Sequence, residues 1–369
     1  MDQSSTEKAK QSTMNNNSPK TILVVGATGF VGPALVEELT RAGYRVICCV
    51  RSLERAADQL QFKNLDFIQV DLNEDLDPAL WLARLKKHQI TGVINNVGIA
   101  NAFGNQSLEN VNVNGPLALF KAVCQYSRYI KSKNQAAEDI HVIQISTTGV
   151  NWPDCDDYEY PRTKKQIDEA LFTIKDLNFT IIRPNIIYEP GRGHILLAQI
   201  ARLPVVAYVG RTHLQPIHCR ELAIGIVRLV NDPKSSNRKV LQATGPEVLT
   251  WRQMFVKVTQ ALGRENCIIF PLPLLVAKLF TNIIQKIPER HLGKLGILSK
   301  LDNETIEMMT KGSVGDNTDW LKHTGLKPIF VYDTYKNLVE STETYDEFIE
   351  STRTEYIAYT SDITTKQIR

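Results

Sequence analysis

The sequence predicts an α/β protein built on a doubly wound parallel sheet. Short apolar runs of strand length alternate along the chain with segments of helical periodicity. Runs without polar alternation are typical of strands covered on both faces, as in a parallel sheet. After about residue 250 the alternation gives way to a mostly helical pattern, which predicts a small C-terminal lobe on the substrate side of the sheet.

Seven buried strands are expected, separated by helices. Helical spacing of apolar side chains follows the first strand at Val31, Leu35 and Leu39, and Gly43 is expected to end that helix. A further helix is expected to run from Tyr160 to about residue 175. The expected strands cover residues 21–25, 45–50, 65–70, 92–97, 141–145, 179–182 and 240–243.

Composition is that of an ordinary globular protein. The 369 residues are 43% hydrophobic and 22% charged, and the net charge of +3 does not predict nucleic-acid binding. The cysteines lack CxxC spacing, so we expect reduced, mostly buried thiols and a reducing compartment. These cysteines are Cys48, Cys49, Cys124, Cys155, Cys219 and Cys267.

Neither end of the chain predicts a membrane span. Residues 1–19 are polar, carry Asp2 and Glu7 without an arginine, and are expected to form a disordered tail rather than a targeting signal. The most apolar stretch, residues 268–287, is interrupted by prolines and lysines and is too short to span. We expect a cytoplasmic protein in which this stretch covers the substrate pocket or contacts a membrane surface or a protein complex.

A glycine-rich turn follows the first strand. Gly26, Gly29 and Gly32, in the segment GATGFVG with Thr28 and Phe30, have the spacing that lets a backbone approach a phosphate. The following helix N-terminus offers free N–H groups and a favourable dipole to that anion. The turn predicts a Rossmann-like dinucleotide-binding domain over residues 20–249, with substrate-side insertions from about 184, followed by the lobe and tail over residues 250–369.

The residues after the second and third strands bear on which dinucleotide binds. Arg51 stands where an acid would read the 2′-hydroxyl of NAD, and an arginine suits the 2′-phosphate of NADP. The alternative is a solvated arginine at a strand end. Asp71 can reach an adenine amino group or simply form a turn. The sequence therefore favours NADP(H), with NAD(H) as the alternative.

A tyrosine and a lysine four residues apart suggest hydride chemistry. Tyr160 and Lys164 share one helix face after the fifth strand, where the ammonium and an oxidised nicotinamide would lower the pKa of the phenol. Thr147 can polarise a substrate carbonyl, or can merely cap the strand end. The same pairing of tyrosine and lysine also arises by chance.

Other polar residues carry weaker signals. His194, His213 and His218 lack metal-ligand spacing, so no metal site is predicted. Pro184, in the segment Arg-Pro-Asn that closes the sixth strand, is expected to line the nicotinamide pocket, although a simple turn would look similar.

Together these motifs resemble the extended and atypical branch of the short-chain dehydrogenase/reductase superfamily. The resemblance covers about residues 20–330 and is closest to the subgroup that contains the NADPH-binding accessory subunit of respiratory complex I and bacterial epimerase/dehydratase-like proteins. The stretches that carry it, besides the glycine turn, are residues 93–98, 160–170, 182–184, 210–218 and 245–251.

The resemblance implies roles for individual residues. Tyr160 would act as acid/base, Lys164 as its partner and ribose ligand, and Thr147 or Ser146 as the hydroxyl group. Asn112 resembles the asparagine that steadies the lysine through water. Asn96, Val97 and Gly98 would complete the cofactor site after the fourth strand.

Two departures from the family pattern argue against activity on a nucleotide sugar. The segment between Thr147 and Tyr160 is short, and residues 95–98 read Asn-Asn-Val-Gly where the family has His-x-Ala-Ala. The resemblance implies an NADP(H)-dependent oxidoreductase or epimerase acting on a small carbonyl or alcohol. The alternatives are a non-catalytic, cofactor-bound structural or assembly protein and a redox sensor.

Overall fold

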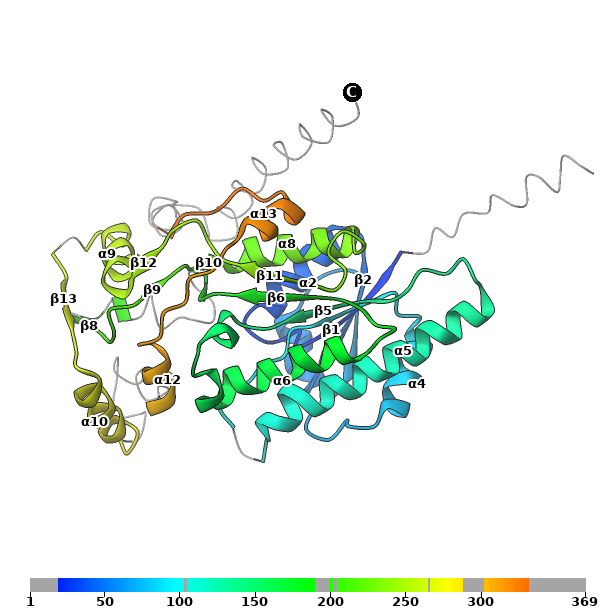
Figure 1. The fold of residues 1–369 in the computed structure, drawn as a ribbon, viewed down its shortest axis with the longest axis horizontal. Helices are drawn as coiled ribbons and strands as arrows, with labels where there is room; N and C mark the ends of the chain where they lie inside the picture. Colours follow the sequence, from blue (N-terminus) through cyan, green and yellow to red (C-terminus); the bar gives the residue numbers. More distant parts are fainter. Residues whose placement is uncertain are drawn as a thin grey trace, which may run out of the picture.

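A seven-stranded, all-parallel sheet forms the centre of the molecule (Figure 1), as the sequence predicts. The structure is a computed structural model and describes residues 19–102, 105–189, 200–201, 203, 205–264, 266–287 and 302–331. The sheet has the order β11-β6-β5-β4-β1-β2-β3. Its strands are β1 (Thr21–Val25), β2 (Arg45–Val50), β3 (Leu65–Gln69), β4 (Gly92–Asn95), β5 (His141–Ile145), β6 (Asn178–Pro184) and β11 (Lys239–Ala243).

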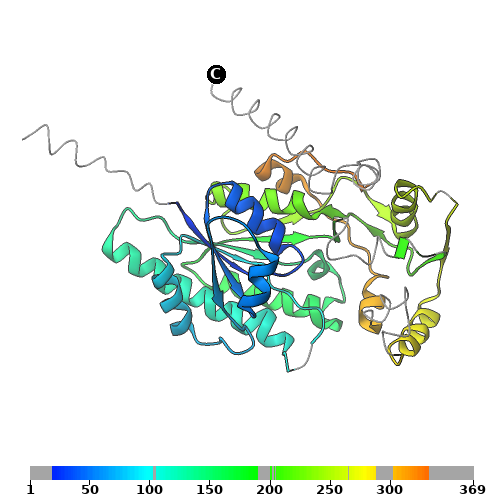
Figure 2. The same ribbon diagram turned by 180° about the vertical axis from the view of Figure 1, so that it is seen from behind.

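Helices cover both faces of this sheet, which buries two separate apolar cores (Figures 1 and 2). One face carries α2 (Gly32–Arg41), α3 (Leu53–Gln59), α8 (Cys219–Asn231) and α13 (Thr318–Thr324). The other carries α4 (Pro78–His88), α5 (Gly115–Lys133) and α6 (Glu159–Thr173). Five of the six cysteines are buried, as expected.

The strand order reverses beside β1, and this position locates the site. β1 pairs with β2 on one side and with β4 on the other. The chain therefore winds outward to β3, returns, and continues through β4 in the opposite direction. Ligands of open α/β sheets bind in the crevice at such a switch point, beyond the carboxyl ends of the strands.

The third strand differs from the prediction. Residues 65–70 were expected to be buried, but β3 ends at Gln69 and its side chains are half-buried or exposed. The reason is its position, because β3 is an edge strand of the sheet.

The lobe beyond the sheet combines short strands with helices, and its described part after residue 250 is mostly helical, as expected. It contains β7 (Ile187–Tyr188), β8 (Val205–Tyr208), β9 (His213–Leu214), β10 (Ile217–His218), β12 (Leu249–Thr250), α9 (Trp251–Ala261), β13 (Ile268–Pro271), α10 (Leu274–Ile284) and α12 (Asn303–Met308). β13 pairs with β8, so the first part of the apolar stretch 268–287 is a strand. The two paired strands are about sixty residues apart in the sequence, so local sequence patterns do not reveal their pairing. No helix of the described part of the chain is long and apolar enough to cross a membrane.

The predicted division at residue 250 remains a prediction, but α13 lies against the sheet domain. Trp320 of α13 is completely buried in the core formed by α2, α8 and the sheet. The expected N-terminal tail, except its last residue, lies outside the described residues.

The contact between α8 and α13 gives a test of this packing. A Cβ atom on Gly225 would lie 2.3 Å from two ring carbons of Trp320. We expect Gly225→Ala to lower the free energy of unfolding, because overpacking costs about 1–3 kcal/mol and the helix propensity of alanine offsets only about 1 kcal/mol. Urea denaturation measures the change. Adding Trp320→Phe should recover part of the loss, and an unchanged stability of Gly225→Ala would contradict the packing.

Candidate active site

The glycine turn is shaped by close contacts that exclude side chains. Gly26 has φ of +81°, and a Cβ atom there would lie 2.8 Å from the carbonyl oxygen of Asn96. A Cβ atom on Gly32 would lie 2.2 Å from the carbonyl oxygen of Ala27. The N–H of Gly29 donates to the carbonyl of Gly26 at 3.1 Å. The turn therefore depends on glycine for its own geometry, whatever it binds.

A cleft of about 190 Å³ lies at the switch point of the sheet. It brings together eight residues predicted from sequence to bind a cofactor: Gly26, Thr28, Gly29, Arg51, Asp71, Asn96, Val97 and Gly98. Side chains that the sequence did not single out, such as Gln106 and Val111, complete it. These groups fit a dinucleotide, since glycine backbone, an arginine and a carboxylate lie along one cleft.

Not every predicted cofactor residue lines this cleft. Phe30 is half-buried and Gly32 is buried at the start of α2, so both lie outside its lining. Gly32 packs against the turn rather than facing a ligand. The N-terminus of α2 has no side-chain cap, because Val31 occupies the N-cap position. Its first N–H groups are thus not satisfied by a capping side chain.

Arg51 and Asp71 lie on the cleft wall beyond β2 and β3. Both are exposed. Asp71 also forms a turn, because its Oδ1 accepts from the N–H of Asn73 at 2.9 Å. The turn interpretation of Asp71 is therefore confirmed, and its contact with an adenine stays a prediction. Arg51 lines the cleft, and its contact with a 2′-phosphate stays a prediction.

Tyr160 and Lys164 converge on Gly98. A Cβ atom on Gly98 would lie 3.4 Å from both the Tyr160 hydroxyl oxygen and Lys164 Nζ. Lys164 Nζ donates to the carbonyl of Val97 at 2.8 Å. Val97 and Gly98 line the cleft, whereas Tyr160 and Lys164 contact these two residues from outside its lining. A Cβ atom on Gly98 would make ordinary van der Waals contact with both functional groups, so alanine, as in the family motif, would also fit here.

Burial moves the two pKa values in opposite directions. Burial, with a further contribution from Asp168, raises the pKa of Tyr160 to about 12. Burial lowers the pKa of Lys164 to about 8, and Asp168 opposes this shift. The expected lowering of the tyrosine pKa required a bound oxidised nicotinamide and stays a prediction, whereas in the chain alone this pKa is raised. Desolvation of the phenolate outweighs any help from the lysine.

The two candidate hydroxyl groups have different surroundings. Ser146 is buried and donates to Asp168 Oδ2 at 2.8 Å, so its hydroxyl is engaged in the core. Thr147 is half-buried and accepts from the N–H of Gly149 at 3.2 Å, capping η2 (Thr148–Asn151). Its hydroxyl hydrogen can still be donated. Thr147 is accordingly the better candidate, and its capping role is present as well.

Asn112 holds the segment that carries the rim of the cleft. It lies in η1 (Asn110–Asn114), a π-helical turn that continues into α5. Its amide accepts from the N–H of Ile99 and donates to the Ile99 carbonyl, both at 3.0 Å. It also donates to Thr163 Oγ1 at 3.0 Å. Asn112 therefore positions the chain after β4 against α6.

Sequence reasoning missed Asp168, which connects the candidate residues. It is almost fully buried on α6, one turn beyond Lys164, and its Oδ2 accepts from Ser146 Oγ and, at 3.0 Å, from Arg183 Nε. Ser146 precedes Thr147, and Arg183 precedes Pro184. Burial raises the pKa of Asp168, while Arg183 and Lys164 oppose that shift. The spacing Tyr160, Lys164, Asp168 along one helix face could have identified it.

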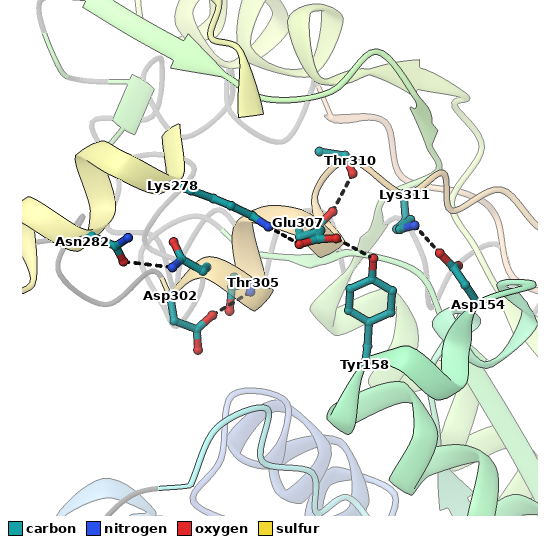
Figure 3. Close-up of polar contacts among 10 residues, drawn as sticks. Asp154, Tyr158, Lys278, Asn282, Asp302, Thr305, Glu307, Thr310 and Lys311 are labelled. Carbon is teal, nitrogen blue, oxygen red and sulfur yellow. Dashed lines mark hydrogen bonds and ion pairs between the residues drawn. The ribbon is translucent and has the colours of Figure 1, made fainter. Parts of the chain in front are cut away.

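Polar contacts tie the start of α6 to the lobe (Figure 3). Tyr158 donates to Glu307 of α12 at 3.2 Å, and Lys311 forms an ion pair with Asp154 beside η3 (Cys155–Asp157). The N–H of Glu159 donates to Glu304 at 2.8 Å. The short segment before Tyr160 is thus held by residues in and just after α12 of the lobe.

The remaining predicted positions have mainly structural surroundings. His218 is buried, caps α8 by accepting from the N–H of Arg220, and has its pKa lowered to about 3 by burial. His213 is exposed in β9, and His194 lies outside the described residues. Pro184 ends β6, and its carbonyl accepts from Thr148 at 3.3 Å. Pro184 does not line the cleft.

Comparison with known proteins identifies the class. The NAD dependent epimerase/dehydratase family matches residues 22–239, more than half of the chain. The chain therefore belongs to this family, which confirms the resemblance to extended short-chain dehydrogenases/reductases. The matched region contains the glycine turn, the cleft and the Tyr160–Lys164 pair.

Individual relatives have different functions. NADH dehydrogenase (ubiquinone) 1 alpha subcomplex subunit 9, mitochondrial, of Dictyostelium discoideum is 25% identical over 253 residues, 67% of this chain but only 65% of that protein. UDP-glucose 4-epimerase of Vibrio cholerae is 27% identical over 318 residues, 80% of this chain and 92% of that protein. The structure of dTDP-glucose 4,6-dehydratase from Bacillus anthracis in complex with NAD has a TM-score of 0.61 at 13% identity, covering 89% of this chain and 99% of that one. The last likeness shows the fold.

Asp168 can be tested apart from any catalytic activity. In Asp168→Asn the negative charge near Lys164 is lost, so the titration midpoint of Lys164 should move to lower pH, away from about 8. We also expect a stability loss of about 1–3 kcal/mol, because the bond to Arg183 loses its charge. Lysine-selective ¹³C NMR across pH measures the first effect. The matched control is Glu169→Gln, which removes an exposed acid from the next position and should change neither quantity. An unmoved Lys164 titration in Asp168→Asn would contradict the assignment.

Proposed function

We propose that this protein is an NADP(H)-dependent oxidoreductase or epimerase/dehydratase-like enzyme acting on a small carbonyl or alcohol. The observation that carries the proposal is the convergence of Tyr160 and Lys164 on Gly98, a residue that lines the cleft. Proton transfer and cofactor binding would thus occur within one continuous site. Membership of the NAD dependent epimerase/dehydratase family supports the same reaction class.

Each part of the site has a separate task in this mechanism. A bound nicotinamide dinucleotide supplies or accepts hydride at the substrate carbon. The backbone of Gly26 and Gly29 binds the pyrophosphate, and Arg51 binds the 2′-phosphate. Lys164 holds the nicotinamide ribose and keeps positive charge beside the phenol.

Tyr160 moves the proton at its phenol oxygen while Thr147 donates a hydrogen bond to the substrate oxygen. With its pKa at about 12 in the chain alone, Tyr160 is protonated at neutral pH. It is therefore ready to act as an acid toward a carbonyl substrate. Acting as a base requires additional positive charge at the site, which would lower its pKa.

Arg51 should set the preference between the two dinucleotides. We expect Arg51→Asp to bind NADPH about 10- to 100-fold more weakly, because a charge-assisted hydrogen bond contributes about 1.5–3 kcal/mol. NADH affinity should be retained or increased. Titration calorimetry with both cofactors measures this. Arg55→Asp, a nearby exposed arginine that does not line the cleft, serves as the charge-matched control. Equal affinities of the wild-type protein for NADPH and NADH would refute the NADP(H) preference.

Tyr160→Phe separates turnover from cofactor binding. We expect turnover to fall about 10²- to 10⁴-fold, the usual contribution of a positioned acid or base, while NADPH affinity stays near the wild-type value. Lys164→Ala should weaken both, because it removes the charge and the bond to Val97. Single-turnover NADPH oxidation with a substrate found by screening, together with cofactor titration, measures the two quantities. Undiminished turnover of Tyr160→Phe would assign the proton transfer to another group.

The second candidate function is a cofactor-bound structural or assembly protein without turnover. It is favoured by the similarity to the subunit of NADH dehydrogenase and by the raised pKa of Tyr160. Tight NADPH retention with no oxidation across a broad carbonyl panel would favour it. The redox-sensor alternative would need the protein's association state to differ between NADPH and NADP⁺.

A further inference from the structure

In helix α10 the polar side chains face the protein and the apolar side chains face outward, the reverse of what is expected for a helix on a protein surface. Its polar side chains are engaged within the protein (Figure 3). Lys278 pairs with Glu307 of α12, and Asn282 accepts from Asn303 at 2.9 Å. The hydroxyl of Thr281 donates to the carbonyl of Ala277 at 2.9 Å and is buried.

The outer face of α10 is correspondingly apolar. Leu275 is 79% exposed, Leu279 62% and Ile283 52%. A helix facing water normally shows the opposite arrangement, with polar residues outside. The exposed apolar residues of this surface, termed here the α10 face, are Ile268, Phe270, Leu275, Val276, Leu279, Phe280, Ile283 and Ile287.

The helix that carries these exposed side chains is firmly packed against the protein on its inner side. Ala277, Thr281 and Ile284 bury the inner side of α10, and Ala277 packs with Ile306 of α12. In both ribbon views α10 and β13 lie at the end of the molecule remote from the helices that cover the sheet (Figures 1 and 2). The α10 face points to solvent rather than toward the cofactor cleft, so of the two sequence expectations for residues 268–287 the surface contact is favoured.

We propose that the α10 face docks on the surface of a lipid bilayer that contains anionic lipids. The charge of the segment matches such a surface, because no Asp or Glu occurs from residue 266 to 287. Lys286 is exposed and has no ion-pair partner among the described residues. Lys278 pairs with Glu307, so Lys286 is the lysine of this segment that an anionic surface can contact. Exposed apolar residues beside a lysine are typical of helices that lie in the membrane interface.

The chemistry of the face favours lipid over a protein partner. Protein interfaces carry about one hydrogen bond per 100–200 Å². On α10, however, Lys278, Thr281 and Asn282 already bond within the chain. Hydrocarbon offers no hydrogen-bonding groups and requires none, so it is complementary to the apolar side chains that remain on the outer side of α10. The helix is also too short to span, so it would lie along the surface.

Vesicle flotation of the full-length protein tests this proposal, which does not depend on the proposed enzymatic activity. We expect binding to phosphatidylcholine vesicles containing about 30% phosphatidylglycerol, and weaker binding to phosphatidylcholine alone. Leu275→Ser with Leu279→Ser should weaken binding about tenfold or more, because two large apolar contacts are lost. Lys286→Gln should weaken binding only to the anionic vesicles.

The matched control is Leu53→Ser with Leu80→Ser, which removes two exposed leucines from α3 and α4 and should leave binding unchanged. Thermal unfolding confirms that each variant is folded, which is expected because all substituted side chains are exposed. Absence of wild-type binding to the anionic vesicles would overturn the proposal, as would equal binding by the Leu275/Leu279 variant. A dimer that the same variant dissociates, without vesicle binding, would assign the α10 face to a second copy of the chain.

Discussion

The candidate site depends most on the bonds that the buried Asp168 carboxylate forms. This carboxylate lies inside the protein and bonds both Ser146 of β5 and Arg183 of β6 from helix α6. A buried acid is tolerated only where hydrogen bonds and opposite charge compensate for lost hydration. That requirement fixes the helix bearing Tyr160 and Lys164 relative to the ends of two strands. Removing the acid would disturb geometry and electrostatics together.

A second constraint is space at the carboxyl ends of the strands. Gly26 lets the turn pass the chain after β4, and Gly98 lies close to the tyrosine hydroxyl and the lysine ammonium. The same backbone segment therefore touches the cofactor cleft and the candidate acid/base pair. Asn112 secures this segment through three hydrogen bonds, which explains how a stretch without regular structure can stay in place.

Polar contacts couple the lobe to this site, in addition to the apolar residues that β7 and β10 contribute to the core beside the sheet. Glu307 contacts both Lys278 of α10 and Tyr158, two residues before Tyr160. A membrane surface bound to the α10 face would therefore contact α10. Through Glu307, this helix is linked to the start of α6 by two polar contacts. Enzymatic function and surface attachment are compatible in one chain, because they use different surfaces.

The sequence by itself determined the sheet, the glycine turn and the Tyr160–Lys164 pair. Each of these is a local feature that can be recognised from the periodicity or spacing of nearby residues. The sequence did not reveal that β3 is an edge strand, that β13 pairs with β8, or that Asp168 links α6 to β5 and β6. It also suggested a lowered pKa for Tyr160, where burial raises it. These properties depend on which distant segments meet and on how far water is excluded. Tertiary structure decides both, because pairing, desolvation and charge act through space and not along the chain.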